Sequence, residues 1–233
     1  MCYDAVGLDM EEYYAETMRL PKERFIMVVS MLAHQPISLI SIPPSANHAL
    51  VAKADILYVP NSGDVGIMAL KKRAELARRF KDMYEKNGSL KVQIMPGFLE
   101  QAMAVVMMYL VAWKADGFQS LEHLRGNTEL WNTILKAQNE ILSLKRFGWT
   151  GWFLSWVLGS WATYKVMKAP AEGASPMDYR EFNAFHHGDK VVRQDVAVLR
   201  DLVKEGEGEG KKMEALRGIL GRVEAMLEAK KTV

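Results

Sequence analysis

The chain has a single cysteine, Cys2, among its 233 residues. One cysteine excludes an internal disulfide, and this favours a reducing compartment. An excess of either charge is also lacking, because 30 basic side chains face 28 acidic ones for a net charge of +2, which argues against a nucleic-acid partner. The first residues, MCYDAVGLDMEEYY, lack the basic and apolar regions of a signal peptide. We therefore expect a cytoplasmic protein with no nucleic-acid partner.

Motifs that carry chemistry on their own are absent from the sequence. It contains no Gly-x-Gly-x-x-Gly turn, no Gly-Lys-Ser/Thr loop and no Gly-x-Ser-x-Gly elbow. Gly63-x-x-Gly66 lies between a predicted strand and a predicted helix, as a phosphate-binding turn would, but lacks the rest of those patterns. His186 and His187 are adjacent, so on a helix they lie about 100° apart, which is poor geometry for one metal ion. We expect no metal site.

Hydrophobic runs long enough to cross a bilayer are also lacking. Residues 102–113 are too short, since about 20 apolar residues are needed, and residues 148–164 are interrupted by serine and threonine. Both runs are predicted to be buried helices of a soluble domain, with no membrane partner. The second run holds Trp149, Trp152, Trp156 and Trp161, so an interfacial role stays open. Contact between two copies of the helical domain, a homodimer, would cover such a surface.

Turn signals and apolar periodicity divide the chain near residue 96. Before it, helices alternate with short β-branched runs, which favours an α/β layer. Strands are predicted at 25–31, 37–42, 55–59 and 90–94, and helices at about 9–20 and 68–87. After Pro96-Gly97 no convincing strand remains, and helices are predicted at 98–115, 120–125, 128–146, 151–168, 178–204 and 211–230. Pro170 and the Glu-Gly repeat at 206–210 are expected to separate helices. We expect an α/β portion over residues 1–96 and an all-helical domain over 97–233.

Residues 176–203 hold the densest set of polar groups able to do chemistry. As one helix they form an apolar stripe and a polar stripe, roughly opposite each other. The apolar stripe is Phe185, Val192, Val196, Leu199 and Val203, and the polar stripe is Asn183, His187, Lys190 and Gln194. Spacing alone favours a solvated face for the polar stripe, and for His186 a helix-flank position with one hydrogen bond. The alternative is a cleft in which His187, Asn183 and Lys190 contact a carboxylate or phosphate.

The order of these segments resembles the ketopantoate reductase (2-dehydropantoate 2-reductase) family. GLDMEEYYAETMRLPKERFIMVVSM is similar to the late part of that family's Rossmann domain, and ADILYVPNSGDVGI is similar to its closing strand pair. LARRFKDMYEKNGSLKVQI resembles its last helix and strand, and DYREFNAFHHGDKVV stands where the family begins a glutamate-containing helix. The resemblance implies a partial Rossmann-type α/β layer followed by an all-α domain of the 6-phosphogluconate dehydrogenase C-terminal type. It also implies NADP as cofactor and a small 2-oxo acid as substrate.

The chain departs from that family at important positions. The Gly-x-Gly-x-x-Gly turn would lie before Met1, so the chain is expected to be a fragment lacking part of the dinucleotide-binding half. The family's catalytic lysine has no counterpart, since no lysine occurs between Lys91 and Lys114. By resemblance, Glu181 and Asn183 are carried over to the substrate site, although Glu181 is offset by one residue relative to Gly188. His187 and Lys190 join them because they share the polar side of the same predicted helix.

Three functions are therefore open. The first is an NADP-dependent 2-oxo acid reductase with Glu181 and Lys190 as catalytic residues and Asn183 and His187 as substrate-binding residues. The second is a non-catalytic helical binding or dimerisation module derived from that family. The third is a membrane-associated helical protein held by the tryptophan-rich run.

Overall fold

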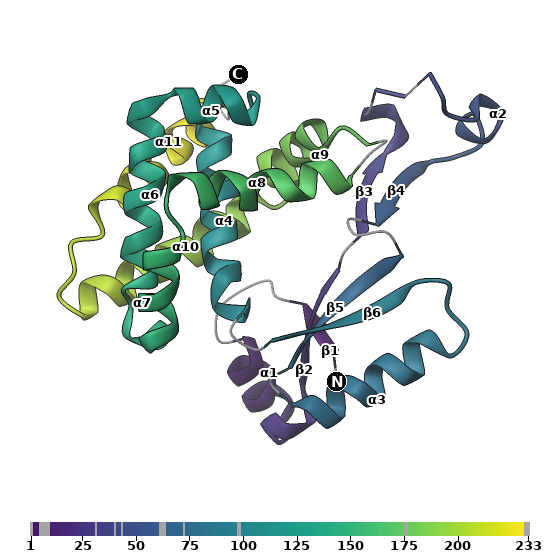
Figure 1. The fold of residues 1–233 in the computed structure, drawn as a ribbon, viewed down its shortest axis with the longest axis horizontal. Helices are drawn as coiled ribbons and strands as arrows, with labels where there is room; N and C mark the ends of the chain where they lie inside the picture. The colour runs from purple at the N-terminus through teal and green to yellow at the C-terminus, as the bar shows by residue number, and fades with distance from the viewer. Residues whose placement is uncertain are drawn as a thin grey trace.

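The computed structural model describes residues 2–4, 10–30, 32–39, 41–42, 44–60, 64–71, 73–96, 99–174 and 177–230. A unit containing two β-sheets precedes a unit made of helices, and the order of an α/β portion and a helical portion agrees with expectation. Figure 1 shows the helical unit on the left, the larger sheet at the lower right and a two-stranded arm at the upper right. No strand occurs among the described residues after Pro96.

The larger sheet has four strands in the order β1-β2-β5-β6. These strands are β1 (Cys2–Asp4), β2 (Ile26–Ser30), β5 (Val65–Lys71) and β6 (Lys91–Pro96). The outer pairs are parallel and each is connected through a helix, α1 (Met10–Met18) or α3 (Ala74–Glu85), whereas β2 and β5 are antiparallel. The sheet therefore consists of two β-α-β units joined at an antiparallel centre.

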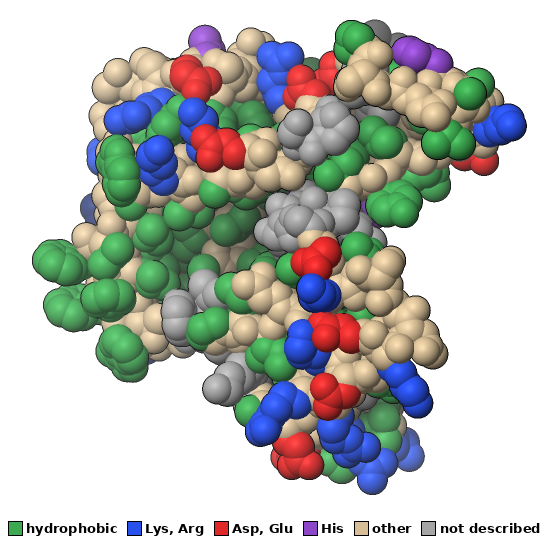
Figure 2. Space-filling view, turned by 45° about the vertical axis from the view of Figure 1, so that its right-hand side comes forward, with side chains coloured by type: hydrophobic (Ala, Val, Ile, Leu, Met, Phe, Trp, Pro, Cys, Tyr) green, Lys and Arg blue, Asp and Glu red, His purple; other side chains and the backbone are tan. Residues whose placement is uncertain are grey.

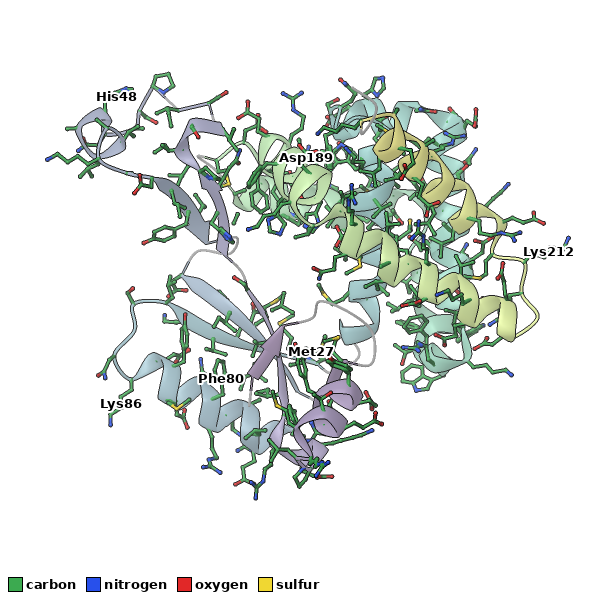
Figure 3. The ribbon with its side chains drawn as sticks, turned by 180° about the vertical axis from the view of Figure 1, so that it is seen from behind. Met27, His48, Phe80, Lys86, Asp189 and Lys212 are labelled. Carbon is green, nitrogen blue, oxygen red and sulfur yellow. The ribbon has the colours of Figure 1, made fainter. Side chains whose placement is uncertain are left out.

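The two helices cover opposite faces of this sheet, because alternate residues of a strand point to opposite sides. Met27 packs with Ala15 and Phe25 against α1, while the neighbouring Ile26 packs with Ala77 against α3. Figure 3 shows Met27 on the α1 side of the sheet and Phe80 on the α3 side. The result is an α/β/α arrangement with both faces of the sheet buried.

Strand β5 corrects a prediction. The expected helix from Met68 begins instead at Ala74, and residues 65–71 form a central strand between β2 and β6. Residues such as Ala69 and Leu70 are good helix formers, but pairing on both sides with neighbouring strands outweighs that local preference.

A two-stranded arm, residues 32–60, is inserted between β2 and β5. Its strands are β3 (Leu32–Pro36) and β4 (Ile56–Pro60), with a 3₁₀ turn at Ile37–Leu39 and α2 at His48–Val51 between them. The strand predicted at 37–42 is wrong, because the hairpin register pairs Leu32 with Pro60 and Pro36 with Ile56. The pairing of β3 with β4 therefore ends at Pro36, just before the segment 37–42 that was predicted as a strand.

The helical unit is built around α4 (Leu99–Ala115), which packs against α6 (Thr128–Leu142), α10 (Val192–Gly208) and α11 (Glu214–Ala229). Met108, Val111 and Ala112 of α4 are fully buried, as expected for a central helix that is apolar on all sides. The prediction that residues 102–113 form a buried helix is confirmed. The short α5 (Leu121–Gly126) closes one end of this unit.

The second apolar run differs from its prediction in two ways. Instead of one buried helix at 151–168, it forms α7 (Gly148–Val157) and α8 (Ser160–Gly173), and its four tryptophans are exposed. Pro170 lies inside α8 and α10 continues through Gly208, so neither expected break occurs where it was predicted. No helix among the described residues is long and apolar enough to span a membrane.

A buried polar network fixes the corner between α7 and α8. Gln138 of α6 donates to the Leu158 carbonyl at 2.6 Å and accepts from the Thr163 hydroxyl of α8 at 2.8 Å. The Tyr109 hydroxyl of α4 also donates to Gln138, and burial raises the pKa of Tyr109 to about 12. Buried amides are costly unless they are bonded, so this network specifies how α4, α6 and α8 meet.

Gly151 allows α7 to lie close to the end of α6, and this gives a testable prediction. A Cβ at Gly151 would lie 2.1 Å from the Leu142 carbonyl oxygen and 2.6 Å from the Phe147 Cβ. Gly151→Ala should therefore destabilise the protein by about 1–3 kcal/mol, as overpacking does, measured by urea unfolding.

The control is Gly218→Ala in α11, where nothing lies within 4 Å of the added Cβ. That change should stabilise the protein by about 0.5–1 kcal/mol. Equal effects of the two substitutions would contradict the described packing of α7.

Candidate functional site

The polar stripe predicted from the sequence begins on α9 (Tyr179–Phe185). Asp178 is the N-cap of this helix, and its carboxylate accepts from the backbone N–H groups of Arg180 at 2.8 Å and Glu181 at 3.1 Å. An aspartate at this position satisfies N–H groups that a helix leaves unbonded and complements the helix dipole. The helix therefore begins where the sequence predicts it.

The predicted single helix over 178–204 is interrupted by a π-helical turn at His186–Lys190. The Val191 N–H donates to the His186 carbonyl at 2.9 Å, an i→i+5 bond in place of the α-helical one. Gly188 lies within this turn against the Phe118 ring, where an added Cβ would be 2.8 Å from Cε2. Such turns occur frequently at functional sites.

The π-turn brings together two residues that an unbroken α-helix would separate. On an α-helix, two side chains eight positions apart point in directions that differ by about 80°. The π-turn has more residues per turn, so it reduces this angle between His187 and Asp195. His187 Nδ1 lies 2.8 Å from Asp195 Oδ2, and Asp195 is only 3% exposed. The buried carboxylate holds the orientation of the imidazole, an arrangement used by His–Asp pairs in acid–base chemistry.

A cavity of about 370 Å³ lies between the two units. Its walls come from three segments: the end of β2 and start of β3, the first half of α4, and the stretch from α9 to α10. All four residues of the predicted polar stripe line it, namely Asn183, His187, Lys190 and Gln194. The structure thus favours the cleft over a simple solvated face for this stripe.

One wall of the cavity is apolar and faces the polar residues. Met103, Val106, Met107 and Leu110 of α4 form that wall. Asn183 is buried, and its amide nitrogen donates to the Tyr179 carbonyl at 2.6 Å, which leaves its oxygen free to accept a hydrogen bond. Lys190 is exposed and makes no hydrogen bond or ion pair with another described residue.

Glu181, the other predicted catalytic residue, does not line this cavity. Its carboxylate accepts from the Ser41 backbone N–H at 3.0 Å and the Ser41 hydroxyl at 2.8 Å. Beside this contact, Ala33 of the arm packs with Met177 and Phe182 in a small apolar cluster. Glu181 thus connects α9 to the arm, and among the described residues its carboxylate bonds to Ser41 and not to the polar residues that line the cavity.

His186 lies in the cavity wall without the hydrogen bond expected of it. Its ring stacks on Phe182 with centroids 5.3 Å apart, and Nδ1 is buried with no partner among the described residues. Burial, with smaller contributions from His187, Lys190 and His34, lowers the pKa of His186 to about 4. The imidazole is therefore neutral at physiological pH.

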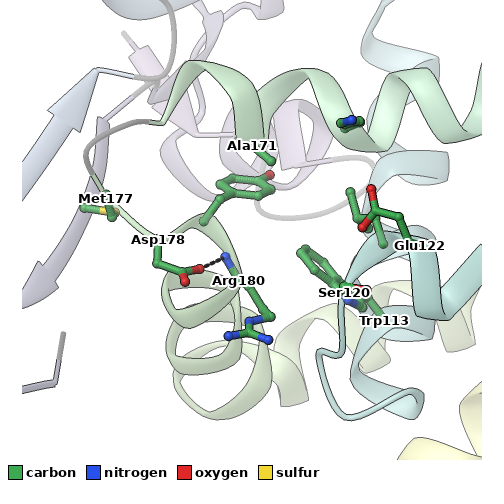
Figure 4. Close-up of a pocket in the computed structure, with 10 residues that line it drawn as sticks. Trp113, Ser120, Glu122, Ala171, Met177, Asp178 and Arg180 are labelled. Atoms are coloured by element: carbon green, nitrogen blue, oxygen red, sulfur yellow. Dashed lines mark hydrogen bonds between the residues drawn. The ribbon is translucent and has the colours of Figure 1, made fainter. Parts of the chain in front are cut away.

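A second hollow of about 350 Å³ lies between α5, α8 and the start of α9 (Figure 4). Its two carboxylates already have partners. Asp178 caps α9, as the dashed line in Figure 4 shows, and Glu122 accepts from the Tyr164 hydroxyl at 2.7 Å. The cavity lined by the polar stripe is therefore the better candidate site.

Two other motifs from the sequence have no role in this site. Gly66 lies within strand β5, and its Cβ position is filled by Leu90, so it is not part of a phosphate-binding turn; Gly63 lies outside the described residues. Where the structure describes the chain, no cluster of three His, Cys, Asp or Glu residues could hold a metal ion.

Sequence reasoning missed Asp195 and the residues that the cavity takes from other elements. Asp195 stands beside Val196 in the expected apolar stripe, and a lone carboxylate among buried positions was the available signal. The contributions of α4 and of His34 depend on tertiary packing and had no local signal. In comparisons with known proteins, no family model, no curated protein and no solved structure matches this chain.

The low pKa of His186 predicts acid sensitivity. Because the unfolded histidine binds a proton below about pH 6.5 and the folded one only below about 4, stability should be fully present above pH 6.5 and fall as the pH drops toward 4. His186→Phe keeps the stacking on Phe182 and removes the titrating group, so its melting temperature should fall less between pH 7 and pH 4.5.

The control is His48→Asn on the exposed surface of α2. It should retain the acid sensitivity of the unmodified protein. A His186→Phe variant that loses as much stability on acidification as the unmodified protein would contradict the assignment.

Proposed function

We propose that the cavity between the two units binds a small 2-oxo acid, as the substrate side of an NADP-dependent reductase of the ketopantoate reductase type. The observation that carries the proposal is Lys190, an ammonium without a partner among the described residues. It borders a small, mainly apolar cavity next to the pair formed by His187 and the buried Asp195.

The charges favour an anionic ligand. Asp195 already accepts a hydrogen bond from His187 Nδ1, so its charge is partly compensated within the protein. Lys190 is left to attract a carboxylate, and hydrogen bonds to charged groups contribute about 1.5–3 kcal/mol each. The cavity therefore recognises the acid group of a ligand through Lys190.

The size and the apolar wall favour a small ligand with an aliphatic part. A volume of about 370 Å³ is at the lower end of the range for small-molecule sites. The side chains of Met103, Val106 and Met107 would contact the carbon skeleton, while the oxygen of Asn183 can accept a hydrogen bond from a ligand hydroxyl.

His187 takes the proton-donating role that the family assigns to a lysine. That lysine would fall early in α4, where the described residues that line the cavity are Met103, Val106, Met107 and Leu110. Since Asp195 engages Nδ1 of His187, Nε2 is the nitrogen that can exchange a proton with a bound keto oxygen. A histidine whose other ring nitrogen is held by a carboxylate can act as a general acid.

The described residues do not form a cradle for a dinucleotide pyrophosphate. The turn before α3 has no glycine, and Arg73 at its N-cap donates to the Phe25 carbonyl at 2.9 Å and binds Glu11. NADP as cofactor therefore rests on the resemblance alone. The residues of this chain are proposed to bind the acid and to donate a proton.

The first test is Lys190→Ala. Removing the ammonium should weaken binding of 2-oxoisovalerate or ketopantoate about tenfold or more, measured by titration calorimetry, with an unchanged melting temperature because Lys190 is exposed. Lys86→Ala at the end of α3 is the matched control and should bind as the unmodified chain does. Equal affinities for the Lys190 variant and the control would refute carboxylate binding at this cavity.

The second test separates catalysis from binding. Asp195→Asn should lower the rate of NADPH oxidation with a 2-oxo acid about a hundredfold, since a positioned acid contributes at least that much, and leave the dissociation constant of the acid within about threefold. If the unmodified chain binds both the acid and NADPH but oxidises no NADPH, the non-catalytic binding module is the better description.

A further inference from the structure

Helix α7 turns its bulky apolar side chains away from the protein. Trp149, Trp152, Phe153 and Trp156 are 76%, 71%, 44% and 79% exposed, and Trp161 at the start of α8 is 66% exposed. Their i, i+3, i+4, i+7 spacing places the four α7 residues within about 100° of one another on the helix. In Figure 2 apolar side chains protrude from the helical unit at the lower left, where α7 lies.

Helix α7 is oriented opposite to an ordinary surface helix, because its bulky apolar side faces away from the protein. Such a stripe normally faces the core, yet among the described residues the inward side of α7 has only Leu154 as a large apolar contact, beside Gly151, which packs directly on the Leu142 carbonyl. Three tryptophans in two helical turns, with a fourth on the next helix, form a larger apolar patch than isolated exposed residues do. We call these five aromatic residues the tryptophan face.

The indole N–H groups indicate what kind of surface covers this face. The two buried tryptophans have partners inside the protein, because Trp113 donates to the Gln119 carbonyl at 2.7 Å and Trp131 to the Ser160 hydroxyl at 2.8 Å. None of the four exposed indoles has a hydrogen-bond partner among the described residues. Side chains with a large apolar ring and one free N–H donor suit an environment that is apolar on one side and offers acceptors on the other, which the headgroup region of a bilayer provides.

The charge around the tryptophan face favours a partner that is anionic. Residues 141–171 contain four basic side chains and no acidic one. Arg146 is paired with Glu205, whereas Lys165 lies 5.9 Å from the Trp161 ring. Lys168, one turn further along the same helix, lies 3.7 Å from the exposed Glu172 carboxylate, an ion pair that water screens strongly. Pairing two copies through this face would bring the same lysines together, because a two-fold interface presents the same patch from both sides.

We propose that the tryptophan face docks on a lipid surface that carries anionic headgroups. The tryptophans enter the headgroup region from α7 and the start of α8, and Lys165 and Lys168 contact the lipid phosphates. The helices lie on the membrane and do not cross it, as amphipathic interfacial helices do. This inference is independent of the 2-oxo acid site.

The test uses the whole chain with vesicles of phosphatidylcholine and phosphatidylserine at a 7:3 ratio. We expect it to float with these vesicles and its tryptophan fluorescence to shift to the blue. Trp152→Ser with Trp156→Ser should reduce the partition coefficient about tenfold or more, since interfacial binding scales with the apolar area inserted. The control removes an exposed apolar pair elsewhere, Ile56→Ser with Tyr58→Ser on β4, and should bind as the unmodified chain.

The lysines give a second readout. Lys165→Gln and Lys168→Gln should each weaken binding to the anionic vesicles about fivefold at low salt, because each lysine near an anionic surface contributes about 1 kcal/mol. The difference should shrink at high salt through screening. Binding that is equal on pure phosphatidylcholine vesicles would overturn the anionic part of the proposal.

Two other results would overturn the proposal as a whole. One is a chain that does not float with vesicles and whose dimer, measured by light scattering, is lost in the double tryptophan variant, since the face would then pair with a second copy. The other is a monomer that does not float. If the double variant fails to fold, brominated lipids are used to quench the tryptophan fluorescence of the unmodified chain. Quenching supports the proposal and its absence overturns it, because the two tryptophans outside the face, Trp113 and Trp131, are buried.

Discussion

The hydrogen bond from the Val191 N–H to the His186 carbonyl is the contact on which the candidate site depends. It closes a π-turn in the middle of what would otherwise be one long helix, and Gly188 lets that turn lie against Phe118. The turn aligns His187 with the buried Asp195 and leaves Lys190 beside the same cavity. A π-turn costs some helical stability, and here the Asp189–Lys230 ion pair holds the outer side of the turn to the end of α11.

The other wall of the site depends on how the arm meets α9. The cluster of Ala33, Met177 and Phe182 and the two hydrogen bonds from Ser41 to Glu181 fix the arm on the helical unit. Because β3 follows directly after β2, this contact also places the end of β2 opposite α4 and α10. A change in the arm would therefore alter the shape of the cavity without touching any residue that faces the ligand.

Local signals in the sequence were sufficient for α4, for the start of α9 and for most of the polar stripe, but not for the bounds of several other helices. Asp178 as N-cap, the apolar stripe through Val192 and Leu199, and the all-apolar character of α4 each have a physical cause within a few residues. The strand at 65–71 could not be recognised in this way, because its partners β2 and β6 come from distant parts of the chain and outweigh the local helix preference. The His187–Asp195 contact was missed for a related reason, since 100° steps assume an unbroken α-helix. The exposure of the tryptophans on α7 and α8 was also missed, because an apolar stripe on a helix usually faces the core.

The network around Gln138 has a consequence for the tryptophan face. By binding the Leu158 carbonyl and the Thr163 hydroxyl, Gln138 fixes the corner from which α7 and α8 diverge. The backbone that carries these aromatic rings is thus already ordered before any partner arrives. Most of the conformational entropy that a flexible loop would lose on association has been lost during folding, so even a few inserted rings can give measurable affinity.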